Sequence, residues 1–392
     1  MKPSMIILGS TGSVGEQAID VAQKFGVSVD ALSAHKNVKR IEAQARAFKV
    51  RACAMSDLEA AHDLRQRLKD TAIKVYAGTN GICEMIAQTD SQSECGQIVE
   101  NSIVGEAGLK PTLATLHAGK KLALANKESL VVGGETVMLA AQEKGIEILP
   151  VDSEHCAIFQ CLRAGNAREI KNIILTASGG PFFGYTKEQL QNVTLETALA
   201  HPTWKMGPKI TVDSATLMNK GFEVIEAIHL FGVTPEQIKV VVHRESIIHS
   251  AVEYIDNSVI AQMSVPDMRH CVQYALTHPD RGTTTTEALD LFSVGKLTFQ
   301  KPDTDTFVLL GTAFDAIRMG GAMPAILNAA NEEAVAAFLQ RKIRFCDIGE
   351  IVCATMENMQ SCKTQHDINE ILICANEARS YTDSLISTRK TF

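Results

Sequence analysis

ILGSTGSVGEQAID, residues 7–20, is the stretch that decides the fold. It joins a short apolar run to a segment with helical apolar spacing, and its three glycines, Gly9, Gly12 and Gly15, follow the pattern G-x-x-G-x-x-G. Such a turn lets backbone N–H groups approach a pyrophosphate, and the start of the following helix adds a favourable dipole. The commoner pattern is G-x-G-x-x-G, so a strand–helix turn without a ligand is the alternative interpretation.

The first 150 residues alternate between short apolar runs and longer segments with helical spacing. The apolar runs are residues 5–8, 27–33, 73–77, 97–104, 121–125 and 146–149. This alternation indicates βαβ units and a parallel sheet. The sequence therefore predicts an α/β fold in which residues 1–150 form a Rossmann-like dinucleotide-binding domain.

The composition changes after residue 150. Glycine and proline gather in SGGPFFGY (178–185) and HPTWKMGPK (201–209), and β-rich runs follow. The C-terminal part is nearly all helical in its pattern. The expected parts are a central α+β catalytic domain at 151–280 with a mobile loop at 178–208, a linker at 281–305, and a C-terminal helical bundle at 306–392.

The overall composition argues against several classes of protein. The 392 residues carry a net charge of −7, whereas broad nucleic-acid binding needs a basic surface. No apolar segment is long enough to span a bilayer and the N-terminus lacks a signal-peptide core, so we expect a cytoplasmic protein without a membrane partner. None of the ten cysteines forms a C-x-x-C pair, and we expect all of them to be reduced thiols.

The end of the second apolar run bears on which dinucleotide would bind. An NAD site carries an acidic residue there to hold the ribose 2′-hydroxyl. The segment ALSAHKN (31–37) has no carboxylate, but it has Lys36 with His35 beside it. A 2′-phosphate gains from such a lysine, so we predict NADP(H). A solvated basic turn is the alternative.

Two acids, Asp152 and Glu154, follow the apolar run IEIL (146–149). In an extended segment these two would share a face, and Ser153 would point to the other face. Close carboxylates repel each other unless a cation or a proton lies between them, and oxygen-only ligands suit Mg²⁺ or Mn²⁺. The alternative is a capping acid and a first-turn glutamate for the helix that follows.

A third acid lies in DSATLMNKGFEVIEA (213–227). Asn219, Lys220 and Glu223 stand at i, i+1 and i+4, so all three can line one face of a helix. Ser214 is expected at the N-terminus of that helix, where a phosphate is stabilised. The segment therefore suggests a cation site beside a phosphate site.

Two alternatives remain open for this helix. Glu226 is a rival ligand three residues after Glu223, and periodicity does not choose between them. The second alternative is an exposed helix whose charge pairs hold no ligand.

Two other stretches hold candidate residues. In NKES (126–129), Asn126 is expected to cap a helix, and Lys127 follows a strand at a place suited to an anionic or hydroxylated substrate. A surface lysine is the alternative. Trp204, the only tryptophan, is expected in a lid that excludes water on closure, and core packing is its alternative.

Seven motifs follow one another along nearly the whole chain. They are GSTGSVG, LANKESLV, PVDSEH, SGGPF, HPTWKMG, VDSATLMNKG-x-E and LNAANE. Together they resemble the 1-deoxy-D-xylulose 5-phosphate reductoisomerase family of the non-mevalonate isoprenoid pathway. The later motifs are far more specific than the glycine loop.

The resemblance implies roles for residues of this chain. The implied ligands of a divalent metal are Asp152, Glu154 and Glu223, which favours Glu223 over Glu226, and the implied catalytic residues are Lys127, Asp152, Glu154 and Glu223. The residues expected to meet the substrate are Lys127, Ser153, Glu154 and Glu223 near its carbonyl and hydroxyl groups, Ser178, His201, Ser214, Asn219 and Lys220 near its phosphate, and Trp204 over it. The residues expected to contact NADPH are Thr11, Gly12, Ser13, Val14, Lys36, Asn37, Asn126, Glu128 and Gly207.

The implied reaction has two stages. A ketose phosphate is isomerised to a branched aldehyde phosphate with the help of Mg²⁺ or Mn²⁺, and NADPH then reduces the aldehyde to 2-C-methyl-D-erythritol 4-phosphate. The resemblance also implies a homodimer. Two other functions remain open on the residues alone: a non-catalytic NADP(H)-binding redox sensor, and a metal-independent dehydrogenase of the homoserine or semialdehyde type.

Three positions depart from the family pattern. His35 stands where a glycine is common, and Thr203 and Lys205 replace an asparagine and a serine in the expected lid. The metal and phosphate residues are unaffected by these departures.

Overall fold

The computed structural model describes residues 2–360, 362 and 367–389. It divides into two compact units of three segments each. The first unit comprises residues 1–129, 137–156 and 267–287, and the second comprises residues 130–136, 157–266 and 288–392. The domain boundaries expected from the sequence stay a prediction.

A seven-stranded sheet forms the centre of the first unit. Its strands are β1 (Ser4–Leu8), β2 (Val29–Ala34), β3 (Ala52–Met55), β4 (Lys74–Ala77), β5 (Gln97–Asn101), β6 (Lys121–Leu124) and β7 (Ile148–Pro150). All neighbours are parallel, in the order β4-β3-β2-β1-β5-β6-β7. The order reverses at β1, so the carboxyl ends of β1 and β5 border the crevice in which such sheets bind ligands.

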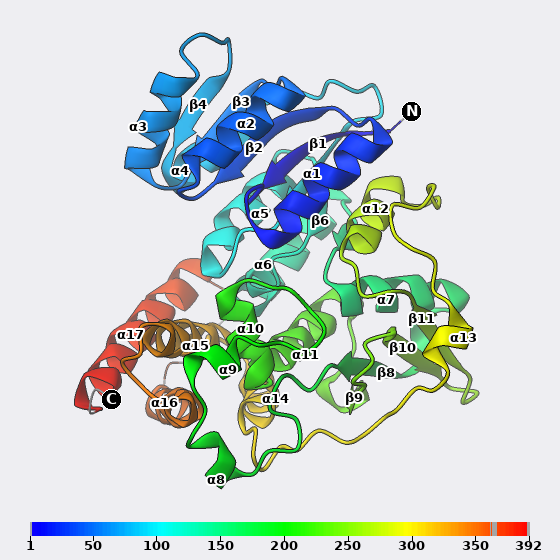
Figure 1. The fold of residues 1–392 in the computed structure, drawn as a ribbon, viewed down its shortest axis with the longest axis vertical. Helices are drawn as coiled ribbons and strands as arrows, with labels where there is room; N and C mark the ends of the chain where they lie inside the picture. Colours follow the sequence, from blue (N-terminus) through cyan, green and yellow to red (C-terminus); the bar gives the residue numbers. More distant parts are fainter. Residues whose placement is uncertain (1, 361, 363–366, 390–392) are drawn as a thin grey trace. The chain divides into compact units, whose positions relative to one another are not determined.

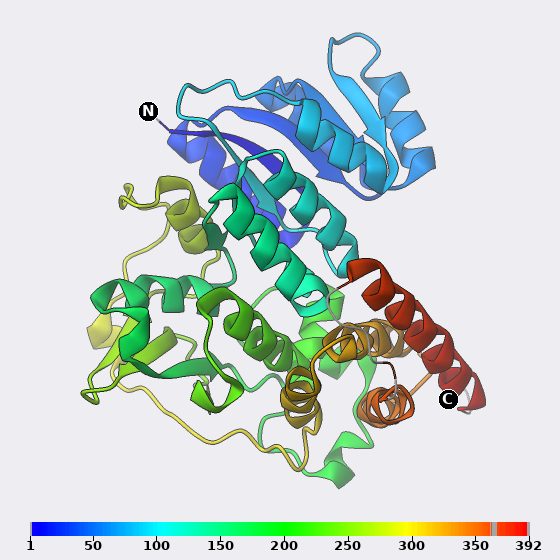
Figure 2. The same ribbon diagram turned by 180° about the vertical axis from the view of Figure 1, so that it is seen from behind.

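Helices cover both faces of this sheet. They are α1 (Ser13–Phe25), α2 (Val38–Phe48), α3 (Leu58–Arg67), α4 (Gly78–Gln88), α5 (Leu109–His117), α6 (Glu128–Lys144, of which residues 130–136 belong to the second unit) and α12 (Arg269–Thr277), with a 3₁₀ turn at Glu106–Gly108. Figure 1 shows α1 and α2 in front of the sheet, and Figure 2 shows α4 and α5 on its other face.

Local sequence explains several of these elements. The strands are continuous apolar runs because both faces of the sheet are buried, and Ile6, Leu8 and Val99 pack with Ile82 and Met85 of α4 in one core cluster. α1 ends at Gly26, which has the left-handed conformation that glycine adopts readily.

The second unit contains a four-stranded sheet. Its strands are β8 (Ile170–Ala177), β9 (Ile238–Val242), β10 (Ile248–Tyr254) and β11 (Val259–Met263). They lie in the order β11-β10-β8-β9, with β8 and β9 parallel and the other pairs antiparallel. β11 is therefore an edge strand.

The helices of the second unit include a C-terminal group that packs together. The helices that precede this group are α7 (Ser153–Cys161, whose first turn belongs to the first unit), α8 (Lys187–Leu190), α9 (Leu195–Ala198), α10 (Pro208–Ala215), α11 (Met218–Phe231) and α13 (Leu291–Val294), with 3₁₀ turns at Leu162–Ala164, Ala167–Glu169 and Pro235–Gln237. The C-terminal group is α14 (Leu309–Met319), α15 (Met323–Leu339), α16 (Phe345–Asn358) and α17 (Ile368–Thr388). α15 contacts α14, α16 and α17. Figure 1 shows α15, α16 and α17 side by side.

These features confirm the predicted fold class: a Rossmann-like parallel sheet, an α+β part with a second sheet, and a helical C-terminal part. One expectation about the cysteines is wrong. Cys362 and Cys374 are joined by a disulfide, and the other eight are free thiols. A search for C-x-x-C pairs does not detect this bond, because its two cysteines are twelve residues apart in the sequence.

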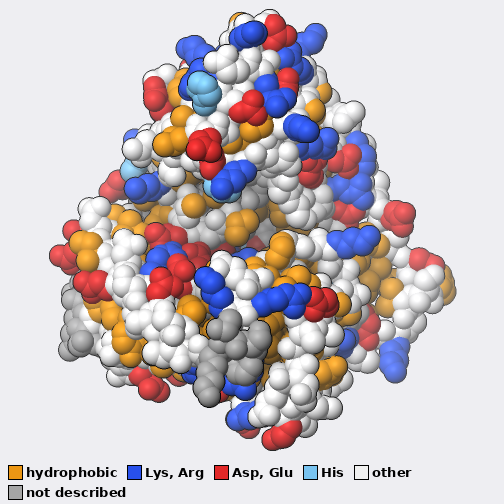
Figure 3. Space-filling view, turned by 60° about the vertical axis from the view of Figure 1, so that its left-hand side comes forward, with side chains coloured by type: hydrophobic (Ala, Val, Ile, Leu, Met, Phe, Trp, Pro, Cys, Tyr) orange, Lys and Arg blue, Asp and Glu red, His pale blue; other side chains and the backbone are white. Residues whose placement is uncertain are grey.

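The outer surface carries charges of both signs. Figure 3 shows acidic and basic side chains interspersed over the face that it draws. None of the helices in the described ranges has the length and apolar character needed to cross a bilayer.

Candidate active site

The expected site residues are distributed over both units. In the first unit lie Thr11, Gly12, Ser13, Val14, Lys36, Asn37, Asn126, Lys127, Glu128, Asp152, Ser153 and Glu154. In the second unit lie Ser178, His201, Trp204, Gly207, Ser214, Asn219, Lys220 and Glu223.

The glycine loop joins β1 to α1, and two of its glycines are required by the backbone. Gly9 has φ +79°, and a Cβ there would lie 2.8 Å from the carbonyl oxygen of Ser102. A Cβ on Gly15 would lie 2.2 Å from the carbonyl oxygen of Gly9, so only glycine lets the helix approach the loop this closely. The loop is therefore shaped by close backbone contacts at the β1–β5 switch point.

The four residues expected at the cofactor, 11–14, lie at the start of α1. Gly12 is the N-cap residue and has no side chain to accept hydrogen bonds from the first turn of the helix. This is the arrangement in which first-turn N–H groups and the helix dipole favour a pyrophosphate. The position agrees with the prediction, and the contact with a cofactor stays a prediction.

Lys36 and Asn37 follow β2. Asn37 caps α2, because its side chain accepts a hydrogen bond from the N–H of Arg40 at 3.2 Å. Lys36 is exposed and forms a 3.5 Å ion pair with Asp57. Both interpretations of the basic turn therefore remain open. The exposure of Lys36 agrees with a solvated turn, and its place at the end of the strand agrees with a 2′-phosphate site.

Asn126 organises the loop after β6. Its side-chain amide donates to the carbonyls of Ile103 at 2.6 Å and Gly105 at 2.9 Å, and its oxygen accepts from the N–H of Ser129 at 3.0 Å. The expected capping role is confirmed, since Ser129 lies in the first turn of α6. Asn126 therefore ties the carboxyl ends of β5 and β6 together.

Lys127 is not the surface lysine of the alternative interpretation. Its ammonium donates to Asp152 at 2.6 Å, and both side chains are over 90% buried. Burial alone would raise the pKa of the Asp152 carboxyl, but the Lys127 ammonium and the His155 ring hold that pKa well below its usual range. Asp152 is therefore ionised at neutral pH, as a metal ligand must be.

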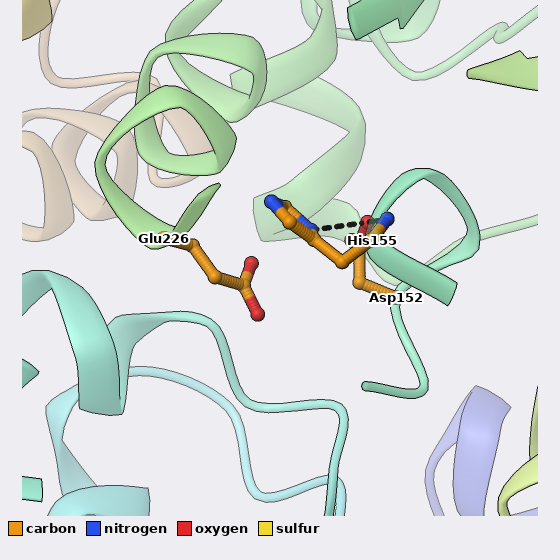
Figure 4. Close-up of side chains that lie close together, drawn as sticks. All are labelled: Asp152, His155 and Glu226. Carbon is orange, nitrogen blue, oxygen red and sulfur yellow. Dashed lines mark hydrogen bonds and ion pairs between the residues drawn. The ribbon is translucent and has the colours of Figure 1, made fainter. Parts of the chain in front are cut away.

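Asp152 also caps a helix. Its Oδ1 accepts from the N–H of Glu154 at 3.1 Å and contacts Nδ1 of His155 at 2.9 Å. Figure 4 shows this His155 contact as a dashed line. The capping interpretation of the acid pair is therefore correct. The second oxygen of Asp152, Oδ2, accepts from Lys127, so a cation bound there would share this carboxylate with the ammonium.

One expectation about the acid pair is wrong. The segment 152–154 is not extended: α7 begins at Ser153, so Ser153 and Glu154 occupy its first turn. The Ser153 hydroxyl donates to the Glu154 carboxylate. Asp152 and Glu154 lie on the same side of the chain because one caps α7 and the other stands in its first turn. The alternation of side chains along an extended strand is not the reason.

In the second unit, Ser178 and His201 lie together. His201 Nδ1 accepts from the N–H groups of Thr203 at 3.2 Å and Trp204 at 2.9 Å. The ring proton must therefore be on Nε2, which donates to the Ser178 hydroxyl at 3.0 Å. The hydroxyl also accepts from Gly180 N–H at 3.3 Å, so its own proton can be donated to a phosphate oxygen.

Burial is the main cause that lowers the pKa of His201 to about 4, and the nearby Arg244 adds to the effect. Sequence reasoning missed this arginine. It donates to the carbonyls of Ser178 at 3.1 Å and Gly180 at 2.7 Å and lies over the Phe183 ring. Arg244 follows β9 in the segment HRES (243–246), which matches no motif. The only sequence feature that could have indicated this residue is its positive charge near the end of a strand.

Trp204 is half-buried and is not a core residue. Its ring lies 6.2 Å, centroid to centroid, from that of His249. Gly207 is the N-cap residue of α10, and Pro208 is the first residue of that helix. The segment 178–208 thus carries three expected substrate residues, and its role as a lid stays a prediction.

Ser214 is not where the sequence placed it. It lies near the C-terminal end of α10, while Asn219 belongs to a separate helix, α11. The helical conformation is interrupted between the two helices at Leu217, which has φ +61°. The argument that Ser214 meets a phosphate through a helix N-terminus is therefore wrong, and only its hydroxyl remains available for that contact.

The predicted face of α11 is confirmed. Asn219 donates to Oε1 of Glu223 at 2.5 Å, and the Lys220 ammonium donates to Oε2 of the same carboxylate. Lys220 and Glu223 are buried, so the exposed-helix alternative is wrong. Glu226, three residues later and labelled in Figure 4, is also fully buried, so burial does not choose between the two glutamates.

Comparison with known proteins decides the family. Models described as 1-deoxy-D-xylulose 5-phosphate reductoisomerase, its C-terminal domain, and the DXP reductoisomerase C-terminal domain match residues 5–134, 148–231 and 263–381. A protein of that name from Acetivibrio thermocellus is 51% identical over 380 residues, which cover 97% of this chain and 98% of the relative.

The chain belongs to the 1-deoxy-D-xylulose 5-phosphate reductoisomerase family.

Solved structures of reductoisomerases agree with this. The enzyme from Zymomonas mobilis, in complex with NADPH, is 39% identical, has a TM-score of 0.90, and covers 99% of this chain and 100% of its own. Another, in complex with NADPH, fosmidomycin and magnesium, is 38% identical, has a TM-score of 0.92 and covers 98% of each chain. The family and the enzyme class predicted from the sequence are confirmed, whereas the individual site residues stay predictions.

Proposed function

We infer that this chain catalyses the metal-dependent isomerisation and NADPH-dependent reduction of 1-deoxy-D-xylulose 5-phosphate to 2-C-methyl-D-erythritol 4-phosphate, a step of non-mevalonate isoprenoid biosynthesis. The observation that carries this inference is the match to reductoisomerases along essentially the entire chain. A partial match to the dinucleotide-binding part alone would have left the chemistry open.

We propose that NADPH lies along the carboxyl ends of β1, β2 and β6. The start of α1 faces its pyrophosphate, Lys36 faces the 2′-phosphate, and the loop tied by Asn126 supports the remainder. The uncapped first turn of α1 and the absence of an acid after β2 support this placement. The proposed contacts are Thr11, Gly12, Ser13, Val14, Lys36, Asn37, Asn126, Glu128 and Gly207.

We propose that Asp152, Glu154 and Glu223 hold a divalent cation. The donor set fits Mg²⁺ or Mn²⁺, because all three are carboxylates and Asp152 is held ionised by its neighbours. When bound, the cation stabilises charge that develops on substrate oxygens, and NADPH supplies the hydride. Lys127 supplies an ammonium at the same strand end, from which it can donate to a substrate oxygen, as the Ser153 hydroxyl can.

We propose that the phosphate of the substrate meets Ser178, Ser214, Asn219 and Lys220. The Ser178 hydroxyl is oriented for this by His201, whose neutral ring donates to it and leaves its proton free. Trp204 would cover the bound substrate and exclude water. Binding energy from the phosphate, remote from the reacting carbons, then orients the sugar.

The test of this function is oxidation of NADPH in the presence of 1-deoxy-D-xylulose 5-phosphate. We expect turnover that EDTA abolishes and that added Mg²⁺ or Mn²⁺ restores, while NADPH binding persists in EDTA. Turnover that is indifferent to EDTA would favour the metal-independent dehydrogenase. NADPH binding without turnover under any metal would favour the redox sensor.

We propose a homodimer whose interface includes β11. This edge strand leaves Val259, Ile260 and Met263 exposed, and Phe292 of α13 in the same unit is almost fully exposed. Unpaired strand edges and apolar patches of this kind are characteristic of subunit interfaces. We also propose a cytoplasmic location. Eight of the ten cysteines are free thiols, which persist in reducing compartments, and the Cys362–Cys374 disulfide is the exception.

A further inference from the structure

A cavity of about 350 Å³ lies in the second unit, lined by residues other than those proposed for catalysis. Its walls come from α8, from the start of α14 and from the start of α16, with Thr216 after α10. The volume is within the range of sites for small organic ligands.

The floor of the cavity is apolar. Leu190, Phe307, Leu309 and Phe345 all line it, and each is at least 93% buried. Polar and charged side chains also line the cavity: Lys187, Gln191, Arg344 and Glu350 are exposed, whereas Thr216 is buried. This combination of an apolar floor with a few polar groups is typical of ligand sites.

The mouth carries positive charge. Lys187 and Arg344 line it together with one acid, Glu350. Glu350 is already paired with Arg389 at 2.8 Å, and Arg344 contacts Asp347 at 2.9 Å. Lys187 is exposed and makes no ion pair with a residue in the described ranges, so its ammonium is available to an anion.

One wall of the cavity belongs to the segment 178–208. Lys187, Leu190 and Gln191 of that segment line the cavity. A second link is the edge-to-face contact between Phe182 and Phe345, whose ring centroids are 5.0 Å apart. A molecule in the cavity would therefore touch the same segment that carries Ser178, His201 and Trp204.

We propose that this cavity binds a small amphipathic anion, with its apolar body against the phenylalanine floor and its acidic group at Lys187, and that occupancy changes the affinity for the sugar phosphate. The binding stands on the cavity alone. The coupling rests on the substrate role proposed above for the segment 178–208. Coupling of this kind is reciprocal, so the sugar phosphate must change the affinity for the anion by the same factor.

Binding is tested with 1-anilinonaphthalene-8-sulfonate, an apolar ring system with one sulfonate, by isothermal titration calorimetry on the full chain with NADPH and Mg²⁺. We expect one saturable site. Lys187→Glu should weaken it by about three- to tenfold, because an attraction becomes a repulsion at the surface. Lys301→Glu, an exposed lysine outside the cavity, is the control and should leave the affinity unchanged.

A second pair of variants tests the location. Cys346 lines the cavity, so Cys346→Trp should fill part of it and abolish binding, whereas Cys346→Ser keeps the volume and should bind normally. Unchanged binding in folded Cys346→Trp, or equal weakening by the Lys187 and Lys301 variants, would overturn the site. If Cys346→Trp fails to fold, the two lysine variants still decide.

The coupling has its own measurement. The calorimetric titration is repeated with Mg²⁺ but without NADPH, in the absence and in the presence of saturating 1-deoxy-D-xylulose 5-phosphate, so that the sugar phosphate can bind the metal-loaded chain but cannot be reduced. We expect the affinity for the probe to change by at least about threefold. An unchanged affinity would overturn the coupling. A missing calorimetric signal for the sugar phosphate itself would instead count against the proposed substrate.

Discussion

His201 shows how one ring fixes a hydroxyl. Its Nδ1 accepts two backbone N–H groups, and its Nε2 donates to Ser178, so a second proton on the ring would displace the N–H groups of Thr203 and Trp204. The depressed pKa of about 4 keeps the ring neutral at physiological pH. The interaction therefore holds both the serine and the segment after the histidine.

This arrangement predicts a dependence of stability on pH. The folded pKa of His201, about 4, lies below the ordinary value of 6.5, so between these values the unfolded chain binds more protons. The contribution of the neutral His201 ring to the free energy of unfolding is fully present above about pH 6.5 and is lost as the pH falls toward about 4. The urea midpoint should fall less between these limits in His201→Gln than in the wild type. His117→Gln, at an exposed histidine, should behave like the wild type.

Glu223 and Glu226 offer a matched pair at one helix. Both are fully buried on α11 and differ by less than one turn. Glu223→Gln should lower kcat by about 100-fold or more, because even residues that only support a metal ligand cost about 10- to 100-fold. NADPH affinity, measured by titration, should be unchanged.

The same pair decides between the rival ligands. Glu226→Gln should lower kcat much less than Glu223→Gln if Glu223 is the metal ligand. The reverse order of effects, with both variants folded, would assign the ligand to Glu226 and contradict the proposed triad.

At the scale of elements, α15 braces α10. Asn331 of α15 is fully buried and donates to the buried Asp213 of α10 at 2.8 Å, and Lys209 of α10 pairs with the other oxygen of Asp213 at 2.9 Å. Asp213 precedes Ser214. The C-terminal helices therefore help to position a residue proposed to meet the substrate phosphate.

Asn331→Ala should therefore destabilise the fold by about 1–3 kcal/mol, the cost of a lost hydrogen bond to a buried carboxylate. It should also raise the KM for the sugar phosphate several-fold while changing kcat little. Asn328→Ala is the control, since Asn328 is equally buried on the same helix but bonds within it to Glu332. A KM change of the same size in both variants would remove the positioning role.

The sequence predicted elements better than it predicted their ends. The alternation of apolar runs and the glycine loop predicted the parallel sheet and six of its strands, because burial on both faces forces continuous apolar strands. The short strand β3 (Ala52–Met55) was missed. The break at Leu217 was not predictable, since a leucine with positive φ contradicts local preference and is imposed by the surrounding packing. Ser214 was misplaced for that reason.

Contacts between distant side chains were also beyond the sequence. The i, i+1, i+4 spacing on α11 predicted its shared face, since helical geometry alone fixes it. The pairing of Lys127 with Asp152 and the approach of Arg244 to Ser178 depend on which strands are neighbours. No local pattern encodes these distances. The strand-end position and the resemblance pointed to Lys127, and only a positive charge near a strand end could have pointed to Arg244.

At the scale of the whole molecule, the assembly can be tested at β11. Ile260→Lys places a charge on the exposed edge strand, and light scattering should then report about half the molar mass of the wild type. Leu139→Ser, at an exposed leucine of α6, is the control and should leave the mass unchanged. A wild type that is already monomeric, or an Ile260→Lys variant that stays dimeric, would contradict the proposed interface.

The pairing of Lys220 with Glu223 has a kinetic consequence. The ammonium proposed to receive the phosphate is already neutralised by a carboxylate proposed to receive the cation. Lys220 is released only when that carboxylate turns to another positive partner. The two ligands should therefore bind in order, with the cation before the sugar phosphate. The association of the sugar phosphate with metal-free enzyme should be slow.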